Sequence, residues 1–127
     1  MKFIAPEKSK KGAAHYNPAV ISNGMLYISG QLPIDPDTGK IVEGGIESQT
    51  KKTLQNLDRI LHAAGITKEH VVQCRIYVDD IANWDSVNEV YALYFGDHRP
   101  ARAIVPCGKL HYGALVEIEA IAEMELS

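Results

Sequence analysis

The sequence has few of the features that would place it in a secreted, membrane or nucleic-acid-binding class. No run approaches the ~20 apolar residues of a membrane span, and the opening MKFIAPEKSKKG has no apolar stretch long enough for a signal peptide. Only two cysteines occur, Cys74 and Cys107, in separate apolar contexts, so we expect reduced thiols rather than a disulfide framework. The formal net charge of −3, with acid and base mixed along the chain, does not match the basic face of a dedicated nucleic-acid binder. We therefore expect a cytoplasmic protein that binds neither membrane nor nucleic acid. The segment KSKKG is the one candidate for a local basic patch.

Motifs for metal, phosphate or dinucleotide binding are also missing. No Gly-rich phosphate loop or dinucleotide fingerprint is present. The cysteines are weak candidates for a nucleophile, because Cys74 alternates onto the presumed core face and Cys107 has no partner base identifiable by motif. We expect neither a metal nor a cofactor. The histidines show no paired spacing of metal ligands and stand at positions 15, 62, 70, 98 and 111.

What the sequence does contain is enough apolar residues for one globular domain spanning residues 1–127, with 46% hydrophobic and 23% charged residues. Apolar runs on either side of Asn23-Gly24 predict a β-hairpin of residues 18–22 and 25–31, since this pair tolerates a type I′ turn. PIDPDTGK then predicts a turn. Strands are also predicted near 101–107 and 115–124.

Two helices interrupt the strands. An apolar stripe from Ile46 to Ala64 recurs at three- and four-residue steps and predicts a helix that ends at Gly65. NWDSVNEVYALYFG predicts a second helix with Asn83 as N-cap and Gly96 at its end. Its predicted buried side comprises Trp84, Val87, Tyr91, Tyr94 and Phe95.

The strand between these helices alternates, with Val72, Cys74, Ile76 and Val78 predicted on one face and Gln73, Arg75 and Tyr77 on the other. The predicted order is β-β-α-β-α-β-β, in which each helix is a crossover of the kind that places strands in parallel. Two helices cover only one face of such a sheet. The other face carries aromatic and aliphatic residues, so we expect a second subunit to cover it. These residues are Tyr27, Tyr77, Leu115 and Ile121.

Charged residues in the last two strands are the candidates for a binding site. Arg102 follows Pro100 at the start of a strand, and its planar guanidinium matches a carboxylate in two parallel hydrogen bonds. The competing interpretation is a salt bridge or an ordinary surface charge. Glu117 and Glu119 share a face of the last strand. There they are either the solvated side of an amphipathic strand or, under a subunit contact, partly desolvated so that one serves as a general base.

Four segments in this order and spacing resemble the RidA family, also called YjgF or L-PSP, the reactive-intermediate deaminases: YISGQLPIDPDTGKIV, VNEVYALYF, PARAIV and VEIEAIAE. The resemblance extends from about Tyr16 to Met124. It implies an α+β fold of the chorismate-mutase-like type, a single mixed sheet with two helices on one face. It also implies a barrel-like homotrimer whose sites lie in clefts between subunits.

The resemblance further implies cofactor-free hydrolysis of enamines and imines such as 2-aminoacrylate to 2-keto acids and ammonia. By position, Arg102 matches the arginine that holds the substrate carboxylate, and Glu117 the acid that positions water. The remaining matches are substrate-binding positions, namely Tyr16, Ser29, Gly30 and Asn88. The sequence departs from the family at Ile104, where many members have cysteine, and at LHYG in place of LPKD. The alternatives are a non-catalytic trimer that binds small carboxylates and a translation inhibitor with ribonuclease activity.

Overall fold

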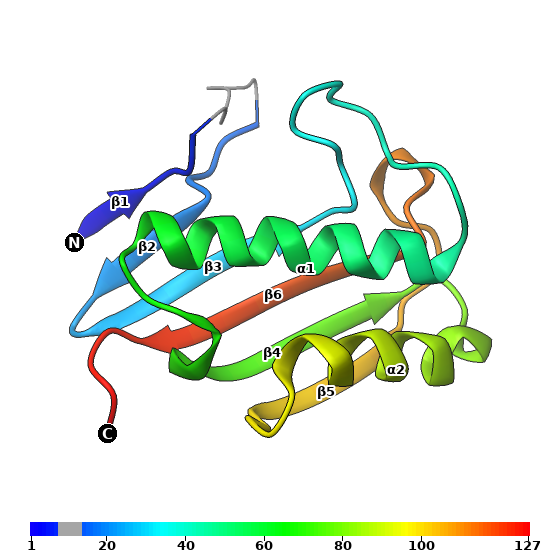
Figure 1. Ribbon diagram of the computed structural model, residues 1–127. Helices are drawn as coiled ribbons and strands as arrows, with labels where there is room; N and C mark the ends of the chain where they lie inside the picture. The colour runs from blue at the N-terminus through cyan, green and yellow to red at the C-terminus, as the bar shows by residue number, and fades with distance from the viewer. Residues whose placement is uncertain (8–13) are drawn as a thin grey trace.

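The protein forms one mixed β-sheet with two helices packed side by side on one of its faces (Figure 1). The structure is a computed structural model and describes residues 1–7 and 14–127, so the basic segment at 8–12 lies outside the described residues. Within those residues, neither helix is long and apolar enough to span a membrane. The helices are α1 (Ile46–Ala63) and α2 (Trp84–Phe95), and the strands are β1 (Lys2–Ile4), β2 (Ala19–Ser22), β3 (Met25–Gln31), β4 (Val71–Val78), β5 (Ala101–Pro106) and β6 (Val116–Glu123). This is the α+β architecture predicted from the sequence.

The predicted hairpin is confirmed. β2 pairs antiparallel with β3, and the two turn residues Asn23 and Gly24 have φ values of 52° and 76°, as a type I′ turn requires. The predicted strand order lacked β1, which pairs antiparallel with β2 at the edge of the sheet. Only Ile4 of its three residues is buried, and three residues are too few for the alternation of apolar and polar residues that identifies a strand.

Helix α1 follows the predicted apolar stripe and buries it against the sheet. Leu57 and Leu61 are fully buried on this stripe. The helix ends where expected: Gly65 has φ 80°, and the backbone N–H of Ile66 donates to the Leu61 carbonyl in the pattern of a glycine C-cap.

Two expectations at β4 and α2 were wrong. Val72 was assigned to the core face of β4, yet it is 42% exposed while Val71 is 2% exposed, because a register shift between Val71 and Gln73 changes the alternation. Asn83 lies at the N-cap position of α2 as predicted, but its side chain makes no capping hydrogen bond there. In the preceding turn the Asp80 carboxylate accepts from the Ala82 N–H.

Trp84, the second error, was placed on the buried side of α2 but is 38% exposed. It lies in the first turn of α2, where the helix covers the edge strand β5 and the inward face meets Arg102 instead of core residues. Val87, Tyr91 and Phe95 are buried as predicted.

Long-range pairing sets the strand directions. β4 and β5 are parallel neighbours joined by α2, as the crossover rule predicts. The crossover through α1 has a different result, because β6 inserts between β3 and β4 and pairs antiparallel with both. β3 and β4 therefore run in the same direction without touching.

Candidate functional site

Arg102 lies on the helix-facing side of β5 and is held by α2. Its Nη1 donates to Asn88 Oδ1 at 2.9 Å. Its guanidinium carbon lies 4.9 Å from the ring centroid of Tyr91 and 5.4 Å from that of Trp84. Among the described residues, no carboxylate forms an ion pair with it. The charge is therefore oriented by an amide and two aromatic rings, and none of the residues that the structure describes supplies it with an anion.

The Arg102 side chain borders an open depression of about 480 Å³ between α2 and the start of β5. Asn88 and Tyr91 form its wall on the helix side, and His98, Arg99 and Pro100 form part of its rim. The His98 ring nitrogen lies 2.7 Å from the Val71 carbonyl, so this residue is engaged by the backbone. The depression has room for a small organic anion beside the guanidinium.

Glu117 lies on the opposite face of the sheet. Cys74 is the register partner of Arg102 and faces the helices, whereas Tyr77 is the register partner of Glu117. Because Cys74 and Tyr77 are an odd number of residues apart on one strand, their side chains point to opposite faces. Arg102 and Glu117 of one chain therefore cannot contact the same small molecule.

The two glutamates of β6 have different environments. Glu119 Oε1 accepts from the Tyr77 hydroxyl at 2.5 Å and lies 3.6 Å from Arg75 Nη1. Glu117 is half-buried and has no hydrogen-bond partner among the described residues. Partial burial raises the pKa of the Glu117 carboxyl above its ordinary value, the neighbouring Glu119 charge adds to the increase, and His111 opposes it. Of the two, Glu117 has the carboxylate that is free to act on a ligand.

Gly30 lies directly beside the Glu117 carboxylate. A Cβ at this position would overlap Glu117 Oε2, so the absence of a side chain on Gly30 is what leaves space for the acid. The pairing of β3 with β6 shifts register between Ile28 and Gln31, and this irregularity brings Gly30 to that place.

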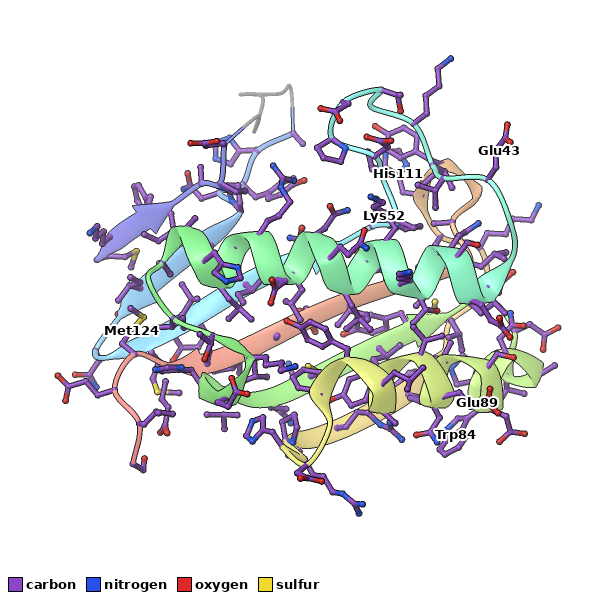
Figure 2. All side chains as sticks on the ribbon, in the orientation of Figure 1. Glu43, Lys52, Trp84, Glu89, His111 and Met124 are labelled. Carbon is purple, nitrogen blue, oxygen red and sulfur yellow. The ribbon has the colours of Figure 1, made fainter. Side chains whose placement is uncertain are left out.

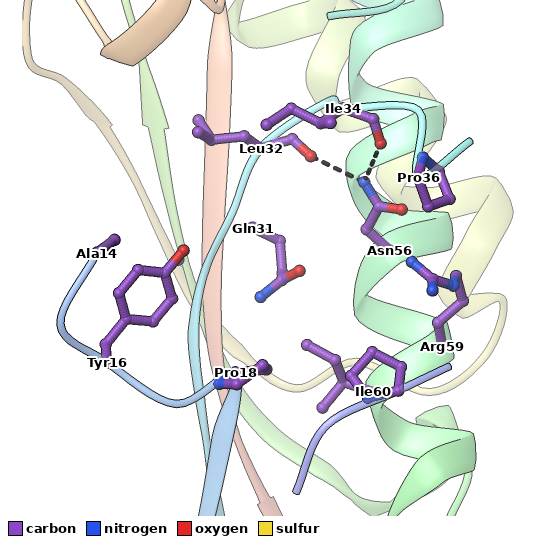
Figure 3. A pocket seen from close by; sticks show the side chains of 12 residues that line it. Ala14, Tyr16, Pro18, Gln31, Leu32, Ile34, Pro36, Asn56, Arg59 and Ile60 are labelled. Carbon is purple, nitrogen blue, oxygen red and sulfur yellow. Dashed lines mark hydrogen bonds between the residues drawn. The ribbon is translucent and has the colours of Figure 1, made fainter. Parts of the chain in front are cut away.

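Ser29 and Tyr16 lie near Gly30 but make different contacts. The Ser29 hydroxyl donates to the Asn17 carbonyl at 2.7 Å and so holds the segment before β2. Tyr16 is 65% exposed and, with Gly30 and Gln31, borders a cavity of about 250 Å³ next to α1 (Figure 3). The predicted site residues thus form two groups. Arg102 and Asn88 lie on the helix side of β5, and Tyr16, Ser29, Gly30 and Glu117 gather around β3 and β6.

Sequence reasoning missed the role of Trp84 and Tyr91, which it treated as core residues. Figure 2 shows Trp84 at the beginning of α2. Trp84, Asn88 and Tyr91 are four and three residues apart, which places all three on one face of a helix. The sequence shows this spacing, but it does not show that the three side chains contact Arg102 on β5.

The two cysteines fit non-catalytic positions. Cys74 is fully buried below Arg102, and burial raises the pKa of its thiol to about 11, which keeps it protonated. Cys107 is exposed after β5, with its sulfur 3.5 Å from the Val78 carbonyl. In the described part of the chain, no three His, Cys, Asp or Glu side chains come together as metal ligands.

Comparisons with known proteins agree with this architecture. The chain is 43% identical to a RutC family protein of Pyrococcus horikoshii over 98% of each chain. It is 39% identical to the 2-iminobutanoate/2-iminopropanoate deaminase of Rattus norvegicus, covering 95% of this chain and 88% of the relative. The crystal structure of E. coli TdcF with bound serine superposes with a TM-score of 0.91 at 29% identity, over 98% of this chain and 100% of TdcF. The family model of Endoribonuclease L-PSP matches residues 7–124, and the chain therefore belongs to this family, which is the RidA and YjgF family.

Proposed function

We propose that the protein hydrolyses reactive 2-enamino and 2-imino acids, of the 2-aminoacrylate type, to 2-keto acids and ammonia. Arg102 binds the substrate carboxylate and Glu117 of a neighbouring protomer positions the attacking water. The observation that carries the proposal is the guanidinium of Arg102, which Asn88 and two aromatic rings orient beside an open depression. In the described part of the chain it has no carboxylate partner.

The positions of Arg102 and Glu117 on opposite faces of the sheet support a shared site. A substrate that contacts both must lie where the β5 edge of one protomer meets the open face of another. That open face has apolar groups suited to such a contact, including Tyr27 at 47% exposure and the half-buried Ile121. We propose a homotrimer, in which each protomer gives one Arg102 and one Glu117 to different clefts.

The chemistry requires little beyond binding and positioning. The iminium carbon is already electrophilic, so water adds to C2 to give a carbinolamine, and the C–N bond then breaks to release ammonia and leave the keto group. Asn88 occupies one N–H of the guanidinium, and the donors that remain form the fork that a carboxylate binds. The raised pKa of Glu117 suits it to accept a proton from water and to return one to the departing nitrogen.

The named relatives support this choice of reaction and of ligand. A mammalian relative that aligns over nearly the whole chain is named for the deamination of two short 2-imino acids. A solved structure of the same fold carries serine, which is a small amino acid with the carboxylate that Arg102 would bind.

A coupled assay tests the proposal. A pyridoxal-phosphate-dependent dehydratase generates 2-aminoacrylate or 2-aminocrotonate, and release of the 2-keto acid is followed with and without this protein. The wild type should accelerate release, and Arg102→Ala should lower kcat/KM by about 10²–10³-fold, the usual effect of removing one member of a close charge pair. Arg102→Lys should lose at least about tenfold, because a point charge lacks the planar fork.

A control variant separates this effect from a general loss of positive charge. Lys51 is exposed on α1 and belongs to neither group of predicted site residues, so Lys51→Ala removes one cation outside the proposed site and should keep wild-type turnover. An Arg102→Lys enzyme with near-normal kcat/KM would refute the carboxylate clamp.

A non-catalytic trimer that binds small carboxylates is the second candidate, and the serine held by TdcF favours it. Saturable binding of serine or pyruvate without acceleration over a panel of imines would support this candidate against the enzyme. A ribonuclease, the activity in the name of the family model, would instead cleave RNA in the absence of any imine. The net charge of −3 argues against RNA as the main partner.

A further inference from the structure

The only tryptophan of the chain contacts the residue proposed to bind the substrate. Trp84 and Tyr91 lie seven residues apart on one side of α2, and the Arg102 guanidinium lies over both rings, at 5.4 Å and 4.9 Å. Asn88, between them in sequence, accepts the hydrogen bond from Nη1 at 2.9 Å. Three side chains of one helix therefore fix a single side chain on the adjacent strand.

The aromatic rings and the amide restrain different motions of the guanidinium. A guanidinium carries all its N–H donors in its own plane, so an aromatic ring over its face takes none of them and restricts tilting of the plane. Asn88 takes one donor at the edge and thereby fixes rotation within the plane. The N–H donors that remain lie in the same plane and can pair with a planar anion.

We propose that Trp84 and Tyr91 are positioning residues that hold the plane of the Arg102 guanidinium, so that its free N–H groups meet a carboxylate without reorganisation. This inference rests on the proposed role of Arg102 as the carboxylate-binding residue. It extends that proposal to the substrate class, since a ligand that uses this fork needs a planar, two-oxygen anion rather than a diffuse negative charge.

The two rings differ in what their removal would disturb. Tyr91 is buried, packs on Phe95 at a centroid distance of 4.6 Å, and belongs to the core, so its truncation would also affect folding. Trp84 is 38% exposed and extends from the first turn of α2. Trp84 is therefore the residue to change. Leu93, which is 85% exposed on the same helix, is the matched control for loss of an apolar side chain.

Isothermal titration calorimetry with pyruvate tests the proposal without any imine chemistry. Trp84→Ala should weaken pyruvate binding by about two- to fivefold, the affinity equivalent of one cation–π contact on a partly exposed ring. Trp84→Phe should recover most of this loss because it keeps a ring under the guanidinium, and Leu93→Ala should bind as the wild type does. Equal affinity of wild type and Trp84→Ala overturns the proposal.

The tryptophan also reports on the contact directly. With a single indole in the chain, emission excited at a wavelength that tyrosine does not absorb comes from Trp84 alone, and Arg102→Ala removes the cation above its ring. The spectrum of Arg102→Ala should differ from that of the wild type, while Leu93→Ala should leave it unchanged. Identical spectra for wild type and Arg102→Ala mean that the stack does not form in solution and overturn the proposal.

Kinetics distinguish positioning from a structural role and from failure of the deaminase assignment. A loss of orientation at Arg102 should raise KM by the same two- to fivefold while kcat is retained. Partial unfolding would instead lower the apparent kcat, because only the folded fraction of the enzyme is active. If the wild type binds pyruvate but hydrolyses no imine, the deaminase proposal fails and the positioning role stands. If the wild type hydrolyses imines and Trp84→Ala matches it in both Kd and KM, the positioning role fails alone. A wild type that neither binds pyruvate nor hydrolyses imines overturns both.

Discussion

The close approach of Gly30 to Glu117 predicts a variant that loses activity while it keeps its fold. In Gly30→Ala the new Cβ would overlap Glu117 Oε2 and would lie 3.1 Å from Glu117 Cδ and 3.4 Å from Cγ. Carbon atoms in contact prefer about 3.5–4.0 Å, so the carboxylate must move by on the order of 1 Å. The backbone of Gly30 lies outside the left-handed region, so alanine adds no conformational strain there.

The expected stability change is small because two terms oppose each other. Forcing the half-buried Glu117 side chain about 30° away from its rotamer costs about 0.5–1.5 kcal/mol. Replacing glycine by alanine where the backbone permits it restricts the unfolded chain and stabilises the protein by about 0.4–1 kcal/mol. The net change should stay within about 1 kcal/mol, equivalent to a Tm shift of about 5 °C or less. Turnover should fall by about 10²-fold, the usual result of displacing a positioning group by 1 Å.

Calorimetric unfolding and the coupled keto-acid assay together measure these two quantities. Gly45→Ala is the matched control, since a Cβ at Gly45, the residue before α1, meets no atom within 4 Å. Gly30→Ala combined with Glu117→Gln should be no slower than Glu117→Gln alone, because both changes act on one carboxylate. Wild-type turnover in Gly30→Ala would refute the argument that the place of this carboxylate matters.

Two further predictions concern stability. The Glu117 pKa is raised in the folded protein, so the folded state holds its proton more tightly than the unfolded state, and stability is lost as pH rises through the interval between the two pKa values. Glu117→Gln should therefore raise Tm at pH 7, a gain that disappears below the ordinary pKa of glutamate; an equal gain at every pH contradicts this. Tyr94→Phe removes a hydroxyl that donates to Asp58 Oδ1 at 2.5 Å and should lower stability by about 1–2 kcal/mol in urea unfolding, with Leu93→Ala unchanged.

The secondary structure followed from local patterns wherever a segment was long enough to show its period. α1 repeats its apolar residues over five turns, and β6 alternates over eight residues, so both were predicted within a residue or two of their observed ends. β1 has three residues and was missed. The alternation of β4 failed at Val72, since a register shift depends on the partner strand and leaves no mark in the sequence of β4 itself.

The candidate site was predictable only in its parts. The resemblance to the family pointed to Arg102, Asn88 and Glu117, and helical spacing was sufficient to put Trp84, Asn88 and Tyr91 on one face of α2. No local pattern could distinguish Glu117 from Glu119, because both alternate onto the same face of β6. Their difference arises from Tyr77 and Arg75 on the neighbouring strand, which engage Glu119, whereas no residue within 1–7 and 14–127 hydrogen-bonds to Glu117.

By itself the sequence determined the two helices, the Asn23-Gly24 hairpin and a sheet with one face left open, because hydrophobic period and turn chemistry act between residues close along the chain. Only the tertiary structure decided that β6 lies between β3 and β4, and that Arg102 and Glu117 face opposite sides of the sheet. Register is the physical reason. A shift of one residue in strand pairing moves every side chain of the strand to the other face of the sheet. Contacts between segments distant in sequence decide which register forms.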